Sequence, residues 1–174
     1  MPFFFLPSGF IIALLILKQH AMTAILFTDP RTKRPSTFSD NINQPMHKPQ
    51  SRISISFTGT TPEVILDKSI GSVFIHGRCL CSNPFDFFQP LIHWATDYIE
   101  NPQEVTVVSI NTDYINTGSS KALLEILRIL AKVQYTGRKI IIKWYFDKGD
   151  EDTCEMIAMI EEIIKVKIQL EVAE

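Results

Sequence analysis

The residues with the clearest capacity for chemistry lie in one stretch, Asp113 to Lys121, with the sequence Asp-Tyr-Ile-Asn-Thr-Gly-Ser-Ser-Lys. It joins a β-type run, Glu104 to Ile110, to a long apolar run with helical spacing. A helix that begins here leaves backbone N–H groups unpaired and carries the positive end of its dipole, which favours an oxygen cap or an anion. We expect Asn116 or Thr117 to be the N-cap. A phosphate on Thr117 would add a charge of about −1.5 to −2 at this point, although the residues alone are equally compatible with a bound anion.

Catalytic groups are not evident elsewhere in the sequence. There is no phosphate-binding Gly-rich loop, no helix with paired His ligands and no Gly-x-Ser-x-Gly elbow. His76 and His93 are isolated, which is more typical of structural or surface groups than of bases. Cys79 and Cys81 lie two positions apart near His76, but a zinc site needs a second ligand pair. We therefore expect no enzyme activity, no cofactor and no metal, and a small enzyme of unknown chemistry is the weaker hypothesis.

The charge balance excludes one class of partner. Residues 1–52 hold six Lys or Arg against two Asp, whereas residues 53–174 hold 11 basic and 17 acidic residues. Binding to a phosphate backbone depends on clustered Lys and Arg, so the acidic body argues against nucleic acid. The three cysteines follow no secreted-domain pattern, which favours a reducing compartment, and we expect a cytoplasmic protein.

The amino-terminal part differs from the rest of the chain. We expect residues 1–27 to be an apolar extension, too short and too interrupted by Pro7 and Gly9 for a membrane span, and residues 28–52 to be a flexible linker rich in Pro, Ser, Thr and Asn. A chain that begins at Met46 would keep every periodic element, which favours a misplaced start codon over a short anchor or a signal-like segment. Contact with a membrane is expected only if the extension belongs to the native protein.

Residues 53–174 have the pattern of an α/β domain. Five runs rich in β-branched residues predict strands at Glu63–Asp67, Ser72–Arg78, Glu104–Ile110, Lys139–Phe146 and Lys167–Val172. Three runs with helical spacing alternate with the later strands. In the first of these runs, Ser82 or Asn83 can cap a helix whose first position is Pro84. Pro90 then interrupts this run, which predicts that the main helix begins there and continues to Glu100. The predicted fold is a two-layer sandwich, a mixed sheet of about five strands with about three helices against it.

Aromatic residues on that first helix admit two interpretations. Phe87, Trp94 and Tyr98 form a second apolar stripe beside the core-facing stripe. They are either additional core or aromatic anchors for a protein partner.

The motif at the junction resembles the SiaC family of bacterial regulatory phosphoproteins. The resemblance covers residues 58–172 and rests on the run Tyr114 to Leu124 with Gly137, Arg138, Trp144 and Tyr145, and on Thr61, Pro62, Gly77, Asn83, Phe88 and Trp94.

The resemblance implies a fold similar to the anti-sigma-factor antagonist (STAS) domain. It also implies that Thr117 is phosphorylated by a Ser/Thr kinase, dephosphorylated by a PP2C-type phosphatase, and framed by Asn116, Gly118, Ser119, Ser120 and Lys121. The unphosphorylated protein would bind and activate a diguanylate cyclase and so control biofilm formation, with no catalysis of its own. Candidate partner-binding residues are Phe87, Trp94, Tyr98, Asn83 and Tyr114. The alternative is an anti-sigma-factor antagonist that acts on an anti-sigma kinase in a partner-switching pathway.

The sequence departs from the family pattern at two places. Cys79, Leu80, Cys81 and Ser82 stand where the family pattern is close to Ser-Tyr-Pro-Glu, so a proline and a carboxylate are lost, which bears on the choice of partner. Gly118 replaces the first Ser after the threonine, which removes one alternative phosphate acceptor.

Overall fold

The computed structural model describes residues 50–173. The predicted extension at residues 1–27, the candidate start at Met46 and nearly all of the predicted linker at 28–52 lie outside them. The described elements follow in the order β1 (Arg52–Ile55), β2 (Glu63–Asp67), β3 (Ser72–His76), α2 (Pro84–Tyr98), β4 (Val105–Asn111), α3 (Thr117–Leu130), the 3-10 helix η1 (Ala131–Thr136), β5 (Lys139–Phe146), α4 (Glu151–Ile164) and β6 (Ile168–Val172).

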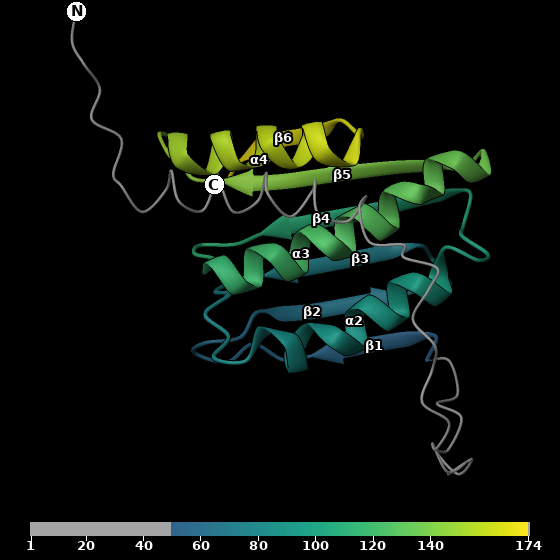
Figure 1. The fold of residues 1–174 in the computed structure, drawn as a ribbon, viewed down its shortest axis with the longest axis horizontal. Helices are drawn as coiled ribbons and strands as arrows, with labels where there is room; N and C mark the ends of the chain where they lie inside the picture. Colours follow the sequence, from purple (N-terminus) through teal and green to yellow (C-terminus); the bar gives the residue numbers. More distant parts are fainter. Residues whose placement is uncertain (1–49, 174) are drawn as a thin grey trace, which may run out of the picture. The chain divides into compact units, whose positions relative to one another are not determined.

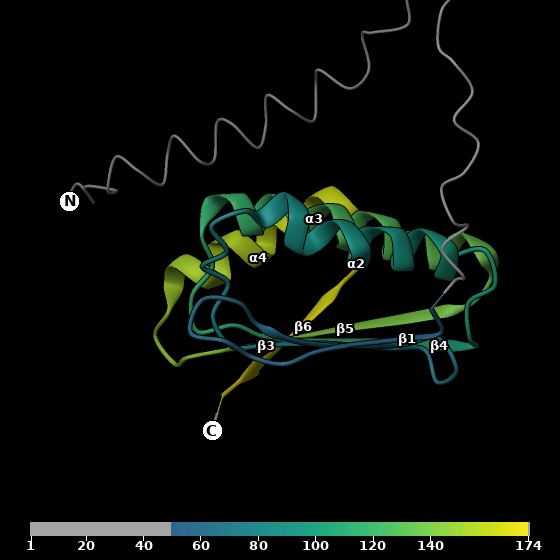
Figure 2. The ribbon, with the colours of Figure 1, turned by 90° about the horizontal axis from the view of Figure 1, so that it is seen from below.

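The strands form one mixed sheet in which spatial order equals chain order, β1-β2-β3-β4-β5-β6 (Figure 1). The first three strands pair antiparallel, and the strands from β3 to β6 pair parallel. Antiparallel neighbours need only short turns, whereas each parallel pair needs a crossover, and α2, α3 and α4 supply these crossovers. All three helices cover the same face of the sheet (Figure 2). The predicted α/β sandwich with a mixed sheet is therefore confirmed.

The core lies between the helices and that face of the sheet. Strands alternate buried and less buried residues, as a sheet covered on one side requires. On the helix side α3 contributes Leu123, Leu127 and Leu130, each at most 1% exposed. None of the helices within residues 50–173 has the length and apolar character needed to cross a membrane.

The structure adds one strand to the predicted sheet and moves one helix boundary. The sheet has six strands, close to the predicted number of about five, and the additional strand is Arg52–Ile55, which pairs with β2 at the edge. The main helix begins at Pro84 instead of Pro90, and Pro90 lies inside it. A helix-interior proline removes one backbone hydrogen bond. Here the complete burial of Phe88 and Leu91 on either side of Pro90 offsets that loss.

The aromatic stripe of α2 is divided between core and surface. Trp94 and Tyr98 are 3% and 1% exposed, and their rings stack with centroids 5.1 Å apart. The Tyr98 hydroxyl is 2.7 Å from the hydroxyl of Thr106, which is itself fully buried on β4. The core interpretation therefore describes these two residues, and neither offers a free aromatic face to a partner. Phe87 is half-buried, with its ring edge-on to Phe88.

This buried pair of hydroxyls gives a test of the packing between α2 and the sheet. We expect Tyr98→Phe to lower the free energy of unfolding by about 1–3 kcal/mol, because the Thr106 hydroxyl would stay buried without a partner. Chemical denaturation would measure the change. The double variant Tyr98→Phe/Thr106→Val should recover part of the loss, since it removes both hydroxyls. The Gln103 N–H, which donates to the Tyr98 hydroxyl at 3.2 Å, loses this acceptor in both variants. Equal or greater instability of the double variant would contradict this assignment.

Candidate functional site

The junction between β4 and α3 is built around the side chain of Asn116. Its backbone is extended, with φ −79° and ψ 161°, and its Oδ1 accepts a hydrogen bond from the Ser119 N–H at 2.8 Å. Asn116 is thus the N-cap and Thr117 is the first helical residue. Of the two caps allowed by the sequence, the structure selects Asn116.

A second loop holds this junction from the side. The Cys79 N–H donates to the Tyr114 carbonyl at 2.8 Å, and the Asn116 N–H donates to the Cys79 carbonyl at 3.0 Å. Cys79 and Ile115 therefore form an isolated parallel bridge beyond the ends of β3 and β4. The Asn116 Nδ2 also donates to the Cys81 carbonyl at 3.2 Å. Hydrogen bonds therefore join the segment after β3, at Cys79 and Cys81, to the segment before α3, at Tyr114 and Asn116.

The same arrangement brings the beginnings of two helices into contact. A Cβ atom on Gly118, the second residue of α3, would come within 2.8 Å of Cγ of Pro84, the first residue of α2. Helix N-termini each carry partial positive charge, so two neighbouring N-termini favour an anion more than one does. The sequence favoured two interpretations of Gly118, close packing and the loss of an alternative phosphate acceptor. It did not identify Pro84 as the contact, because no local pattern reports which residues meet across two helices.

The three hydroxyl groups in the first turn of α3 differ in their exposure to solvent. Thr117 is exposed to solvent, as are Gly118 and Lys121. Ser119 is fully buried, and its Oγ has no hydrogen-bond partner within residues 50–173. Ser120 is half-buried and donates its hydroxyl to the Asn116 carbonyl at 3.0 Å. Only the Thr117 hydroxyl within this turn combines exposure with freedom from an internal hydrogen bond among the described residues.

The predicted partner-binding residues lie in two places. Asn83 and Tyr114 are exposed in the two loops that meet at the junction, Asn83 next to Pro84 and Tyr114 in contact with the Cys79 backbone. Tyr114 keeps 55% of its surface exposed. Trp94 and Tyr98 lie farther along α2 with their rings buried.

The two cysteines of the supporting loop are structural. Cys79 is fully buried and Cys81 is 4% exposed, and both are free thiols. Burial, with a smaller contribution from the neighbouring Cys81, raises the pKa of the Cys79 thiol to about 12. A thiol with this pKa stays protonated at neutral pH, which disfavours metal binding and nucleophilic attack. Among residues 50–173, no group of three or more His, Cys, Asp or Glu side chains is placed to hold a metal ion.

Asn116 both caps α3 and donates to the Cys81 carbonyl, and two substitutions distinguish these contributions to stability. We expect Asn116→Ala to lower the free energy of unfolding by about 1–2 kcal/mol, because both the cap of α3 and the bond to the Cys81 carbonyl are lost. Asn116→Asp keeps an oxygen cap and should cost less than half as much. Denaturation curves for the two variants provide the comparison, and equal losses would show that the cap contributes little.

The contact between Gly118 and Pro84 gives a second test. We expect Gly118→Ala to destabilise the protein by about 1–3 kcal/mol, because the new methyl group must displace Pro84. Gly59→Ala is the matched control, since a Cβ there meets nothing within 4 Å. Thermal unfolding of both variants would check this. A Gly118→Ala protein as stable as the control would mean that the two helix ends move apart without cost.

The sequence and the fold of this chain are similar to those of known proteins. A curated relative, an uncharacterized protein of Pseudomonas aeruginosa strain UCBPP-PA14, is 26% identical over 106 residues, which cover 61% of this chain and 84% of that protein. The crystal structure of apo-SiaC from Pseudomonas aeruginosa matches with 23% identity and a TM-score of 0.63, over 70% of this chain and 99% of that one.

A second match is the crystal structure of the diguanylate cyclase SiaD in complex with its activator SiaC, also from Pseudomonas aeruginosa. The identity is 23% and the TM-score 0.64, over 70% of this chain and 99% of the matched chain. These structural likenesses establish a shared fold. The family model described as SiaC family regulatory phosphoprotein matches residues 55–173, which include every described strand from β2 onward and all three helices. The chain therefore belongs to the SiaC family of regulatory phosphoproteins.

Proposed function

We propose that this protein is a non-catalytic signalling adaptor that is switched by reversible phosphorylation of Thr117. In this proposal a Ser/Thr kinase adds the phosphate and a PP2C-type phosphatase removes it. The unphosphorylated form binds and activates a diguanylate cyclase, which links the switch to the control of biofilm formation. Membership of a family of regulatory phosphoproteins supports the general role, and the complex of SiaD with its activator SiaC supports the choice of partner.

The exposed hydroxyl of Thr117 is the observation that carries the choice of residue. A kinase needs an accessible hydroxyl. The Ser119 hydroxyl is buried, and the Ser120 hydroxyl donates a hydrogen bond to the Asn116 carbonyl. A phosphate at the first position of α3 would lie at the positive end of that helix and next to the N-terminus of α2. The fold therefore tolerates the modification without a change of structure.

The consequence of phosphorylation is a change of charge on an exposed surface. Asp113 and Tyr114 are exposed just before the site, and Lys121 is exposed one turn after it. A phosphate carries a charge of about −1.5 to −2 and three strong acceptor oxygens. Lys121, four residues along the same helix, is placed to compensate part of this charge. A partner that docks over Thr117 in the unmodified protein would meet both new bulk and an unpaired charge, and such contacts oppose binding.

Phosphopeptide mapping of the protein, purified from the cells that produce it, would test the site. We expect one phosphate on Thr117, none in Thr117→Ala, and full incorporation in the matched variant Ser120→Ala. Diguanylate cyclase activity would then be measured with the two forms, and the unphosphorylated protein should raise the rate of cyclic di-GMP synthesis while the phosphorylated protein should not. Phosphate on another residue would overturn the site. Equal activation by both forms, or capture of an anti-sigma kinase without a cyclase, would overturn the proposed output.

A further inference from the structure

The residues on both sides of Thr117 are held in place by hydrogen bonds. Three of these bonds join backbone groups, and three involve the side chain of Asn116 or Ser120. The residues that they connect are Cys79, Cys81, Tyr114, Asn116, Ser119 and Ser120. A kinase that binds its substrate as an extended strand would have to break all of these bonds before the Thr117 hydroxyl could enter its cleft.

Opening this segment is unfavourable. Each hydrogen bond contributes roughly a factor of two to ten to the equilibrium between the closed and the open segment. The open segment is then present in at most about 2% of the molecules. An enzyme that selects the open segment loses apparent affinity about 50-fold or more. An enzyme that accepts Thr117 in the first turn of α3 avoids this loss, so the hydrogen bonds favour recognition of the folded surface.

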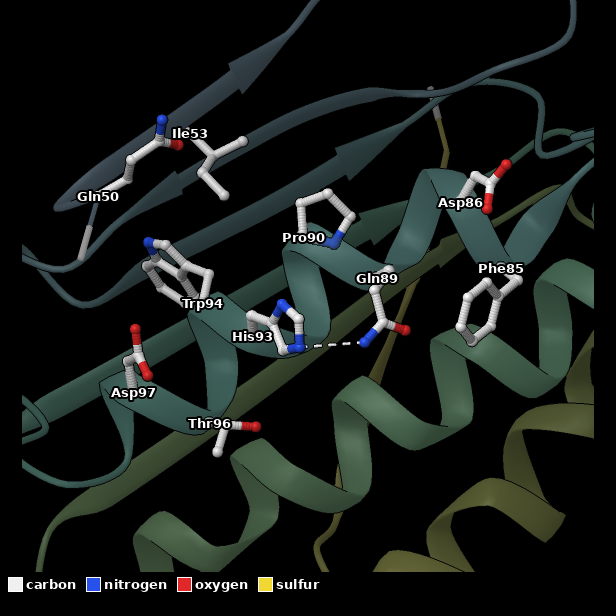
Figure 3. Close-up of a pocket in the computed structure, with 10 residues that line it drawn as sticks. All are labelled: Gln50, Ile53, Phe85, Asp86, Gln89, Pro90, His93, Trp94, Thr96 and Asp97. Carbon is white, nitrogen blue, oxygen red and sulfur yellow. Dashed lines mark hydrogen bonds between the residues drawn. The ribbon is translucent and has the colours of Figure 1, made fainter. Parts of the chain in front are cut away.

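Phe85 is an exposed aromatic residue close to Thr117, although it belongs to another helix. It follows Pro84, whose Cγ would lie 2.8 Å from a Cβ atom on Gly118, the residue after Thr117. Phe85 is 70% exposed, and Figure 3 shows its ring beside the first turn of α2, on the side where α3 lies. Aromatic side chains are enriched among the residues that dominate the energy of protein–protein binding. Phe85 therefore has the chemistry of an anchor next to the hydroxyl.

The enzyme that phosphorylates Thr117 must cover the surface around this residue. A specific protein–protein interface buries about 800 Å² on each partner, which corresponds to roughly 20–30 residues. A surface of this size around Thr117 includes the start of α2 as well as the start of α3, because the two helix starts meet at Gly118 and Pro84. The kinase therefore covers Phe85 whenever it holds the Thr117 hydroxyl.

We propose that the Ser/Thr kinase recognises Thr117 on the folded junction of α2 and α3, and that Phe85 anchors the kinase there. This inference rests on the proposed phosphorylation of Thr117. In the transfer, Thr117 Oγ1 forms a bond to the γ-phosphorus of ATP while the bond from that phosphorus to the bridging oxygen breaks. ADP leaves with the electron pair, and the hydroxyl proton passes to a base of the kinase. Phe85 takes no part in these bond changes and acts as a positioning residue.

The first test compares the folded protein with its isolated segment. Full-length protein and a synthetic peptide of residues 111–123 are incubated at equal concentration with ATP and an extract of the cells that produce the protein. Phosphopeptide mapping over time gives the rate of phosphate incorporation at Thr117, and Thr117→Ala is the blank. The peptide lacks the packing that stabilises the helix. We expect it to be phosphorylated about tenfold more slowly or less, whereas a kinase that reads a linear motif would modify it at least as fast as the protein.

The second test changes Phe85 in the full-length protein and uses the same assay. We expect Phe85→Ser to lower the rate about fivefold or more, and Phe85→Tyr, which keeps the ring, to retain the rate of the parent. Tyr135→Ser is the matched control, because Tyr135 is 77% exposed and lies beyond the other end of α3. It should be phosphorylated as the parent is. Thermal unfolding of each variant checks that the fold is unchanged.

The outcomes separate this inference from the proposed function. A peptide that is phosphorylated as fast as the protein, or a Phe85→Ser protein that is phosphorylated at the rate of the parent, would overturn the inference and leave the phosphorylation of Thr117 intact. Absence of phosphate from Thr117 of the parent, both in the extract and in the protein purified from the cells, would overturn the proposed function and this inference with it.

Discussion

The amide of Asn116 is the interaction on which the candidate site depends. Its oxygen caps α3, and its nitrogen holds the carbonyl of Cys81 in the neighbouring loop. The position of α2 follows, because the loop that Asn116 holds leads directly into Asn83, the N-cap of α2. Asn116 therefore fixes the start of α3 and links it to the loop that leads to the start of α2. The exposed position of Thr117 is a result of this geometry, since the cap fixes which residue of the first turn faces solvent.

Local chemistry made much of this arrangement predictable. The Asn-Thr-Gly-Ser-Ser run indicated a helix start, and the β-branched runs located five of the six strands. The edge strand β1 was missed because four residues with alternating exposure carry little signal. The predicted helix start at Pro90 was wrong. The loss of one backbone hydrogen bond at this proline is outweighed by the burial of Phe88 and Leu91, which depends on the complete fold. The pairing of Cys79 with Ile115 was beyond prediction, since backbone hydrogen bonds between distant loops leave no trace in residue type.

The structure also clarifies the departure from the family pattern at residues 79–82. Cys79 and Cys81 are buried and Leu80 is half-buried, so these three residues contact mainly the inside of the protein. Ser82 is exposed next to the cap of α2. In the pattern that the resemblance implies, position 82 carries a carboxylate, so a partner can contact the departure from that pattern at Ser82. A surface change of this kind alters the electrostatic match with a partner while the fold stays the same.

The strand order of the sheet has a consequence for how the protein forms. Because each strand lies beside the one that precedes it in the chain, each new strand pairs with a neighbour that has already been synthesised. In the described sheet no strand inserts between two others, and each parallel pairing from β3 onward closes a crossover that contains a helix. The segments that build the Thr117 junction are β3, α2, β4 and α3, all of which precede β5 in the chain. All the elements of this junction are thus synthesised before the last two strands of the sheet.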